Sequence, residues 1–392
     1  MSKLLFLTLE FSASDSDAGG VGRMYHDLCR AMPSHQVVVW TPPRPEVKID
    51  PASLTDDTFT VRRAPLLATR GWPRWLPAVT RVGEYLDYLR TDKLVIGQIL
   101  PLGIVAWLLK QQRSICYGIF VHGMDISQPM HVLRRRWLMR KILKNADVVF
   151  AANKYVAVLV QKLGVSADRI IVVYPSPSLR RQPDARLLDN LRCRYAIDEV
   201  PILLTVGRLV KRKGHDIVLR ALDIVWRELP QTRYIIVGSG PELSRLQGLA
   251  SGLSRPENVA FVGQLPDDDV AGWFTLATVF IMTPRTMPDG DVEGLGMVYL
   301  EAAKFRKPSI ATRSGGVGEA VLDGETGLLV PEDDVEATAR AILSLLKDAD
   351  LRQAMGERAS ERIERDFSAR RGANSIILAL ENAANRQGPP NN

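Results

Sequence analysis

Two glutamates separated by seven residues, Glu293 and Glu301, flank the predicted start of a helix in the C-terminal half of the sequence. An apolar strand ends near Met282, a turn-rich loop follows, and the helix is expected to begin near Leu295. The first N–H groups of a helix lack intrahelical partners and attract phosphate. The two carboxylates could bind hydroxyl groups on either side of that phosphate. The pattern therefore predicts a ligand such as a nucleotide sugar, although an ordinary strand, loop and capped helix would also explain it.

Four consecutive residues at this helix start are predicted to contact the ligand through their main chain. They are Gly294, Leu295, Gly296 and Met297. Neither glycine has a Cβ, so an anion can approach the backbone closely.

A basic loop, VGRLVKRKG at residues 206–214, directly follows another predicted strand. Fixed cations at the carboxyl end of a strand can hold a diphosphate, and Arg208 and Lys213 are the candidates. Lys211 and Arg212 are as basic as Lys213, and the pattern alone does not select among these three. A solvated basic loop is the alternative, but the glycines at both ends of the loop favour a binding role.

Three further turns follow predicted strands and could bring the backbone close to a nucleotide, or could simply reverse the chain. They are DAGGVG with Gly20, VGSGP with Gly238, and FVG with Val262.

The segment VHGMD, after the predicted strand 115–121, contains His122 and Asp125. A single histidine is more often structural than chemical, but this one lies at the carboxyl end of a strand, where ligands bind in α/β proteins. The pair Asp289 and Asp291 resembles the acidic pairs that hold a divalent metal in some sugar-transferring enzymes. No further ligand cluster accompanies it in the sequence, so we expect a plain loop and no metal site.

The chain has 392 residues, which predicts two domains, and its hydrophobic content of 46% is typical of globular proteins. No apolar run is long enough to span a membrane, and the N-terminus reads as a first strand. The three cysteines are scattered without CxxC spacing, which favours a reducing cytoplasm. Residues 1–175 carry 23 Lys/Arg and 14 Asp/Glu, whereas the rest of the chain is slightly acidic. This asymmetry predicts an anionic partner for the N-terminal half, such as lipid headgroups, a membrane surface or nucleic acid.

Short apolar strands alternate with helical patterns in both halves, which predicts the α/β class with parallel sheets covered by helices. In the first half, the expected strands are 4–9, 37–40, 94–98, 115–121, 148–151 and 170–173. A polar segment, 179–199, is interpreted as the domain linker. The predicted domains are therefore residues 1–178 and 179–369, with a last helix at 370–386.

Six Lys and Arg residues lie in the segment 134–144, interleaved with Trp137 and aliphatic residues. Such a helix could lie on an anionic membrane, but its apolar residues could equally be packed in the core, and we favour the core. Trp72 and Trp75 are a second candidate contact with lipid or sugar, with a packed loop as the alternative.

Taken together, the motifs resemble the retaining "group 1" glycosyltransferases of family 4, which have the GT-B architecture. The resemblance is strongest through VGRLVKRKG, VGSGPE, FVGQLP, DVEGLGMVYLEA, SGGVGEAV and DGETGLLV. The two glutamates with DVEGLG are particularly similar to those of bacterial phosphatidylinositol mannosyltransferase-like members. The resemblance implies two Rossmann-like domains facing across a cleft, the first for the acceptor and the second for the nucleotide sugar, with the last helix returning to the first domain.

The resemblance also implies residue roles. Arg208 and Lys213 would hold the diphosphate, Glu293 the sugar hydroxyls and Glu301 the ribose. Main-chain contacts would come from 294–297, with Gly238 and Val262 near the nucleotide. In the N-terminal half, Gly20 would lie by the diphosphate, His122 by the donor sugar, and Asp125 on the acceptor side.

The expected reaction is the retaining transfer of a hexose from a GDP-mannose or UDP-glucose type donor to a lipid-linked, phospholipid or glycan acceptor in cell-envelope or polysaccharide synthesis. We expect no cofactor and no metal requirement, a cytoplasmic protein with peripheral contact to the inner face of an anionic membrane, and no nucleic-acid partner. Two alternatives remain: an epimerase or hydrolase acting on nucleotide sugars, and a non-catalytic protein that binds an anionic surface.

Overall fold

The computed structural model describes residues 3–11, 20–43, 55–56, 58–70, 72–127, 132–177, 183–195, 197 and 199–387. The chain divides into two compact units. Unit 1 comprises Met1–Ser176 and Phe367–Asn392, and unit 2 comprises Pro177–Asp366. The division lies two residues before the boundary expected after residue 178, and the chain re-enters unit 1 at Phe367 rather than after residue 369.

Unit 1 is built on a sheet whose described strands have the order β3-β4-β2-β1-β5-β6-β7-β8, parallel except for the β3–β4 pair. The strands are β1 (Leu4–Leu7), β2 (Val37–Thr41), β3 (Thr55–Asp56), β4 (Phe59–Arg63), β5 (Lys93–Ile96), β6 (Cys116–Val121), β7 (Val148–Ala151) and β8 (Ile170–Val172). The helices are α1 (Gly20–Ala31), α2 (Leu76–Leu89), α3 (Leu102–Gln112), α4 (Met124–Ser127), α5 (Leu133–Asn145), α6 (Lys154–Lys162) and α15 (Ala369–Gln387).

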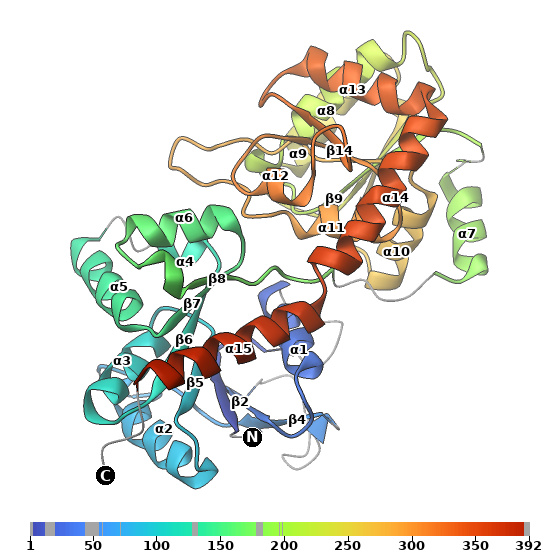
Figure 1. The fold of residues 1–392 in the computed structure, drawn as a ribbon. Coiled ribbons are helices and arrows are strands. Elements are labelled where there is room, and N and C mark those ends of the chain that lie inside the picture. Colours follow the sequence, from blue (N-terminus) through green and yellow to red (C-terminus); the bar gives the residue numbers. More distant parts are fainter. Residues whose placement is uncertain are drawn as a thin grey trace. The chain divides into compact units, whose positions relative to one another are not determined.

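Helices cover both faces of this sheet, because successive side chains of a strand point to opposite faces. Leu5 and Leu7 of β1 belong to a core with α2, α3, α5 and α6, whereas Leu4 and Phe6 belong to a core with α1 and α15. Figure 1 shows α15 lying across the sheet beside α1, and these two helices make extensive contact. The central strands β1, β2, β5, β6 and β7 are buried on both faces, which explains their continuous apolar sequences.

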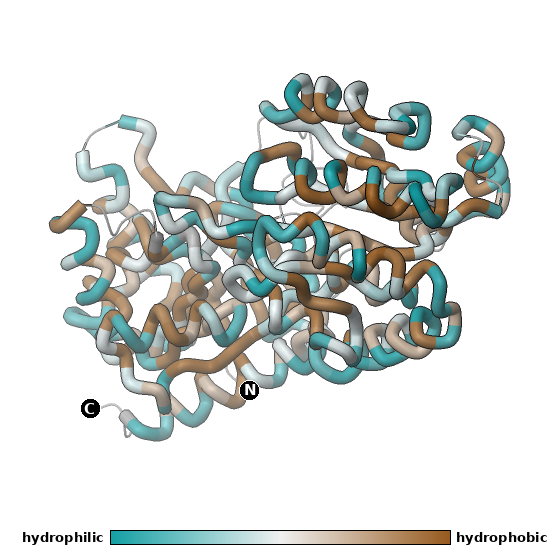
Figure 2. Tube along the Cα trace, turned by 90° about the horizontal axis from the view of Figure 1, so that it is seen from above, coloured by the Kyte–Doolittle hydropathy of each residue, from teal (hydrophilic) through white to brown (hydrophobic). Residues whose placement is uncertain are grey.

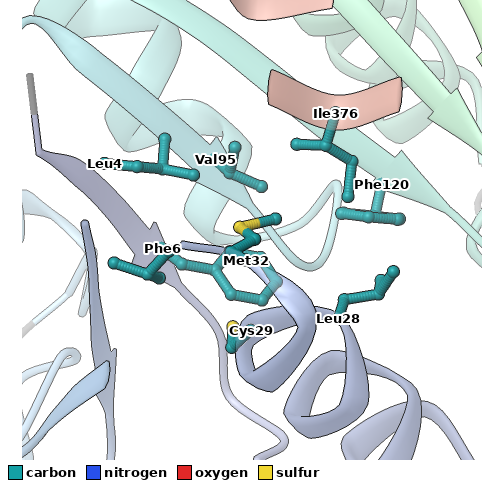
Figure 3. Close-up of a pocket in the computed structure, with 9 residues that line it drawn as sticks. Leu4, Phe6, Leu28, Cys29, Met32, Val95, Phe120 and Ile376 are labelled. Carbon is teal, nitrogen blue, oxygen red and sulfur yellow. The ribbon is translucent and has the colours of Figure 1, made fainter. Parts of the chain in front are cut away.

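A small apolar cavity lies within the second of these cores (Figure 3). It is lined by side chains from the region of α1, from α15 and from the sheet. The lining exposes no polar atom, whereas ligand pockets carry a few polar groups that orient the ligand. Cys29 borders it, and burial raises the pKa of this thiol far above its usual range. We interpret the cavity as a packing gap rather than a ligand site.

Unit 2 contains a parallel sheet whose described strands have the order β11-β10-β9-β12-β13-β14. The strands are β9 (Ile202–Val206), β10 (Arg233–Val237), β11 (Val259–Gly263), β12 (Val279–Ile281), β13 (Ser309–Thr312) and β14 (Gly327–Val330). The helices are α7 (Ala185–Tyr195), α8 (His215–Val225), α9 (Leu243–Ser251), α10 (Asp267–Leu276), α11 (Met297–Lys304), α12 (Val317–Ala320), α13 (Val335–Lys347) and α14 (Ala349–Asp366). In Figure 2 the coiled stretches of the chain change between brown and teal along their length, as expected for helices with one apolar and one polar face.

The strand order of unit 2 changes direction between β9 and β12, which are neighbours in the sheet. The chain proceeds from β9 to β10 and β11 on one side, and from β12 to β13 and β14 on the other. At such a switch point the loops leaving the two central strands diverge, and a ligand can bind between them. These two loops are the basic loop after β9 and the glutamate-containing loop after β12.

The expected linker at 179–199 is wrong for its central part, where the structure has the helix α7. Leu191 of α7 is buried against α10, and the ring of Tyr195 lies edge-on to Trp273 at a centroid distance of 5.1 Å. The segment looked like a linker because most of its exposed face is charged. The strands predicted for the first half also omitted β3 and β4.

Candidate functional site

The basic loop of unit 2 and the loop after β12 are joined by backbone contacts. Gly214 has a left-handed conformation, with φ of 72°, and a Cβ at this position would lie 1.8 Å from the carbonyl oxygen of Thr283. The Thr283 hydroxyl donates to the carbonyl of Gly214 at 2.9 Å, and the N–H of Arg285 donates to the carbonyl of Arg212 at 2.8 Å. Gly214 is therefore required for the close contact between the basic loop and the loop after β12. This contact holds the side chains of the two loops near one another.

Two cations of the basic loop converge on one carboxylate of the other loop. Lys213 Nζ lies 2.7 Å from Glu293 Oε2, and Arg212 Nη1 lies 2.5 Å from the same oxygen. Burial alone would raise the pKa of Glu293, but Lys213 and Arg212 outweigh burial and hold that pKa below its usual range. Glu293 is therefore ionised at neutral pH. The structure thus distinguishes Arg212 and Lys213 from Lys211, which is exposed.

Arg208, the other predicted phosphate ligand, precedes these cations in the same loop. Its side chain is exposed and its guanidinium forms no ion pair with a residue that the structure describes. Its carbonyl accepts a hydrogen bond from Nε2 of the buried His215 at 3.3 Å, which ties the loop to the start of α8. Burial is the main cause that lowers the pKa of His215 to about 4, so this histidine is neutral at pH 7.

Arg285, which the sequence interpretation missed, connects the loop after β12 to the basic loop and to the start of α8. It is buried, and its guanidinium lies 2.8 Å from Asp216 at the start of α8 and 2.9 Å from Asp333. Through its own N–H it also holds the carbonyl of Arg212. The sequence alone could not reveal this ion pair, because Arg285 and Asp216 lie 69 residues apart in the chain. We interpret Arg285 as the residue that fixes the basic loop.

The predicted phosphate-binding helix start is α11, which begins at Met297, two residues later than expected. Gly296 is its N-cap, with φ of 79°, and this left-handed conformation delays the helix. A Cβ on Gly294 would meet no atom within 4 Å, so the backbone there is open to a ligand. Leu295 is buried, whereas Glu301 is half-buried on α11. The stretch therefore has the two features that main-chain binding requires: a helix start and open space beside a glycine.

Gly238 and Val262 lie at the carboxyl ends of β10, which pairs with β9, and of β11, which pairs with β10. Gly238 has φ of 136°, and a Cβ there would lie 2.0 Å from the carbonyl oxygen of Gly207. This glycine is required for the packing of two neighbouring turns, which explains it without a ligand. Val262 is half-buried, and its neighbour Gly263 accepts a hydrogen bond from the N–H of Gly238 at 2.7 Å.

In unit 1, the predicted residues lie at the carboxyl ends of the central strands. Gly20 is the first residue of α1, and a Cβ there would meet nothing within 4 Å; residues 17–19 of its motif lie outside the described residues. His122 follows β6 and is half-buried, with Nε2 2.6 Å from the hydroxyl of Tyr25. Desolvation lowers the pKa of His122 to about 4, so its ring is neutral at pH 7.

Asp125 lies in α4, one turn after His122. Its Oδ2 accepts the backbone N–H of His122 at 3.2 Å, so it shapes the turn that carries the histidine. Burial raises the pKa of Asp125 to about 6. The described hydrogen bond of its side chain is made to a residue three positions earlier in the chain. The acceptor-side role that the resemblance implies stays a prediction.

The acidic pair before Glu293 is engaged in protein contacts. Asp291 Oδ2 lies 3.0 Å from Arg212 Nε, and Asp289 Oδ1 accepts the N–H of Asp291 at 3.1 Å. Among the residues that the structure describes, no group of three or more His, Cys, Asp or Glu side chains could hold a metal ion.

Comparison with known proteins identifies related sequences over both units. The family described as Glycosyl transferases group 1 matches residues 190–362, and the Glycosyl transferase 4-like domain matches residues 19–176. A protein of Mycolicibacterium smegmatis, "GDP-mannose-dependent alpha-(1-6)-phosphatidylinositol monomannoside mannosyltransferase", is 37% identical over 66% of this chain and 68% of its own length. A Corynebacterium glutamicum enzyme for the monoacylated form of the same acceptor is 32% identical over 76% of this chain and 79% of its own length.

Solved structures show the same fold at lower identity. Anabaena HepE in complex with UDP has a TM-score of 0.78 at 19% identity, covering 97% of this chain and 100% of HepE. Sucrose-phosphate synthase from Thermosynechococcus elongatus has a TM-score of 0.75 at 23% identity, covering 97% and 99% of the two chains. The sequence matches show that the chain belongs to the group 1, family 4 glycosyltransferases, enzymes that transfer a hexose from a nucleotide sugar, and the solved structures show that it has the GT-B fold.

Proposed function

We propose that this protein transfers mannose from GDP-mannose to a phosphatidylinositol mannoside-type lipid, with retention of configuration. The observation that supports it best is the convergence of Lys213 and Arg212 on Glu293 beside the start of α11. This arrangement offers cations for a diphosphate and a carboxylate for sugar hydroxyls. The donor and acceptor are proposed from the names of the relatives at 37% and 32% identity. UDP-glucose is the second candidate donor, because HepE of the same fold was solved with it.

The proposed mechanism depends on stabilising the departing diphosphate. Arg208 and Lys213 would neutralise the charge that grows on the leaving oxygen, and the N–H groups at the start of α11 would add to this effect. The acceptor hydroxyl would attack from the face that the diphosphate leaves, and the departing oxygen would take its proton. The two carboxylates nearest these cations are both ion-paired, Glu293 with Lys213 and Arg212 and Asp291 with Arg212, so neither is a free nucleophile for a covalent intermediate, and we therefore favour same-face attack. We further propose that these protein cations suffice without a metal.

A thermal-shift screen tests the donor first. GDP-mannose and GDP should raise the melting temperature more than UDP-glucose and UDP, because a ligand that binds only the folded state stabilises it by mass action. Transfer is then measured with phosphatidylinositol monomannoside in vesicles, with and without EDTA, and NMR of the product reports the anomer. A product with inverted anomeric configuration would overturn the proposed mechanism. Loss of activity in EDTA would overturn the proposal that no metal is needed. Rapid donor breakdown without acceptor would favour a hydrolase, and conversion of the donor into another nucleotide sugar would favour an epimerase.

We also propose that α5 of unit 1 contacts an anionic membrane at which the acceptor is found. Met139, Ile142 and Leu143 of α5 are buried, as the core interpretation expected, but Leu133 and Trp137 are 82% and 56% exposed. These two residues are four positions apart and therefore share one helix face. No helix in the described residues is long and apolar enough to cross the bilayer. Contact through an exposed helix face would be the alternative way to reach a lipid acceptor.

Charge supports this choice of partner. Six cations lie in α5, none of them forms an ion pair with a described residue, and the helix contains no acid. They are Arg134, Arg135, Arg136, Arg140, Lys141 and Lys144. Lys141 lies on the exposed side with Nζ 5.8 Å from the ring of Trp137. A face that combines aromatic, aliphatic and cationic side chains fits the interface of an anionic bilayer.

A second exposed apolar group lies near the start of α2. Trp72 is 85% and Leu76 54% exposed, whereas Trp75 packs against the core. Helices α2 and α5 both pack on α3, so they cover the same face of the sheet, and both follow the carboxyl ends of strands. The two exposed groups therefore lie on one face and toward one edge of unit 1.

Vesicle flotation tests the membrane contact. Wild type should float with vesicles containing phosphatidylglycerol and not with pure phosphatidylcholine, and high salt should release it. The double variant L133S/W137S should lose most of this binding. Leu378→Ser, which removes a side chain of similar exposure from α15, is the matched control. Equal flotation of wild type and the double variant would contradict the proposal.

A further inference from the structure

We infer that Tyr25 is a positioning residue that fixes the tautomer of His122, so that His122 offers Nδ1 as a hydrogen-bond acceptor to a ligand hydroxyl. The statement that Nδ1 accepts from a ligand hydroxyl rests on the proposed function. The statement that Tyr25 fixes the tautomer rests on the contacts within unit 1 alone.

Tyr25 is fully buried in α1, and its hydroxyl has two neighbours. It donates to the carbonyl oxygen of Gly97, which follows β5, and it lies 2.6 Å from His122 Nε2. Burial raises the pKa of Tyr25 well above its usual value, so the hydroxyl keeps its hydrogen at all relevant pH values.

The hydrogen count decides the direction of the second contact. A carbonyl oxygen can only accept, so the single hydroxyl hydrogen of Tyr25 points to Gly97. Toward His122 the same oxygen can therefore only accept, and Nε2 must carry the hydrogen. A neutral imidazole has one ring hydrogen, which leaves Nδ1 with a lone pair.

The surroundings hold the ring in this orientation. Phe120 stacks on His122 with an interplanar angle of 6° at 6.0 Å, and Tyr25 lies edge-on at 5.5 Å. Asp125 binds the backbone N–H of His122. His122 Nδ1 makes no hydrogen bond with a described residue, and this atom is not fully buried. His215 Nδ1, in contrast, is buried without a hydrogen-bond partner. The Nδ1 edge of His122 therefore reaches the surface of unit 1.

This arrangement sets the chemistry that His122 can offer. A neutral ring with a lone pair at its accessible edge attracts a hydroxyl hydrogen and repels phosphate oxygen. His122 is thus suited to a sugar hydroxyl and not to the diphosphate. A bound sugar without the matching hydroxyl would leave Nδ1 without a hydrogen bond in the complex, and a single acceptor can discriminate among hexoses in this way.

The ring nitrogens of His122 are observable by 15N NMR in the complete, ligand-free protein, with His122→Gln used for assignment. We expect Nε2 protonated and Nδ1 bare in wild type. Tyr25→Phe should produce a mixture of tautomers and lower kcat for transfer by about 10- to 100-fold, while the affinity for GDP stays unchanged. Tyr117→Phe is the matched control, because Tyr117 is equally buried and its hydroxyl donates to a carbonyl, that of Ile142 at 2.7 Å, away from His122.

The outcomes separate the two proposals. Protonation of Nδ1 in wild type would overturn the inference by itself, whether or not Tyr25→Phe folds. A correct tautomer with no effect of Tyr25→Phe on kcat beyond that of Tyr117→Phe would overturn the positioning role. If no sugar is transferred by wild type, the proposed function fails, but the spectrum still decides the tautomer.

Discussion

Lys213 and Glu293 form an ion pair of 2.7 Å, although one residue follows β9 and the other precedes α11. A diphosphate would compete with Glu293 for the ammonium group of Lys213. Arg212, which binds both Glu293 and Asp291, can keep Glu293 paired when Lys213 turns to the phosphate. We therefore expect the three side chains to act as a unit, and single substitutions to have unequal effects on folding and on transfer.

Lys213→Ala should lower kcat by about 100-fold or more, because the charge of Lys213 is needed most as the diphosphate departs. The variant should remain folded, since Arg212 still pairs with Glu293. Steady-state kinetics and the melting temperature check both parts. Lys211→Ala, in the same loop but exposed, should behave like wild type; near-normal turnover of Lys213→Ala would refute the role.

Glu293→Gln should lower the free energy of unfolding by roughly 2–4 kcal/mol at pH 7, because it leaves partly buried cations without their carboxylate. The pKa of Glu293 is lowered in the folded state, so its contribution is complete above the unfolded pKa of about 4.3 and is lost as the pH falls below it. Denaturant titrations at pH 7 and pH 3.5 should show the gap to wild type shrinking. Glu364→Gln, which changes an exposed carboxylate on α14, should show no gap at either pH.

Gly214→Ala should lower the free energy of unfolding by about 3 kcal/mol or more, because its Cβ would collide with the Thr283 carbonyl and its φ is positive. The control is Gly248→Ala in α9, where a Cβ would meet no atom within 4 Å. That change should stabilise the protein by up to about 1 kcal/mol, since alanine is the better helix former. Urea unfolding of both variants measures the contrast, and similar effects of the two would contradict the described packing of the loops.

His215 should make the protein less stable in mild acid. Its pKa is lowered to about 4 in the folded state against about 6.5 in an unfolded chain, so the unfolded state binds the extra proton between these values. Stability therefore falls as the pH drops from 6.5 toward 4, by about 2 kcal/mol at pH 5. His215→Gln cannot titrate. Its disadvantage against wild type at pH 8 should shrink at pH 5, and a pH-independent difference would show that His215 is not buried in the neutral form.

Much of the fold could be predicted because its cause is local. The strand β7 has the expected bounds, and the other strands expected in the first half lie within two residues of their predicted ends, since buried parallel strands are short continuous apolar runs. The prediction omitted β4, whose side chains alternate in burial, and α7, whose exposed face is charged. Both lack a strong apolar signal because they lie at the periphery of their sheets or units.

The site divides in the same way. Residue types and their order were sufficient to predict the α/β class, the family resemblance and the candidates Arg208, Lys213 and Glu293. Only the tertiary structure decided that Arg212 shares Glu293 with Lys213, that Tyr25 binds His122, and that Trp137 is exposed. The physical reason is distance along the chain: these pairs lie 81 and 97 residues apart, and periodicity reports which side of an element is apolar, not which element packs against it.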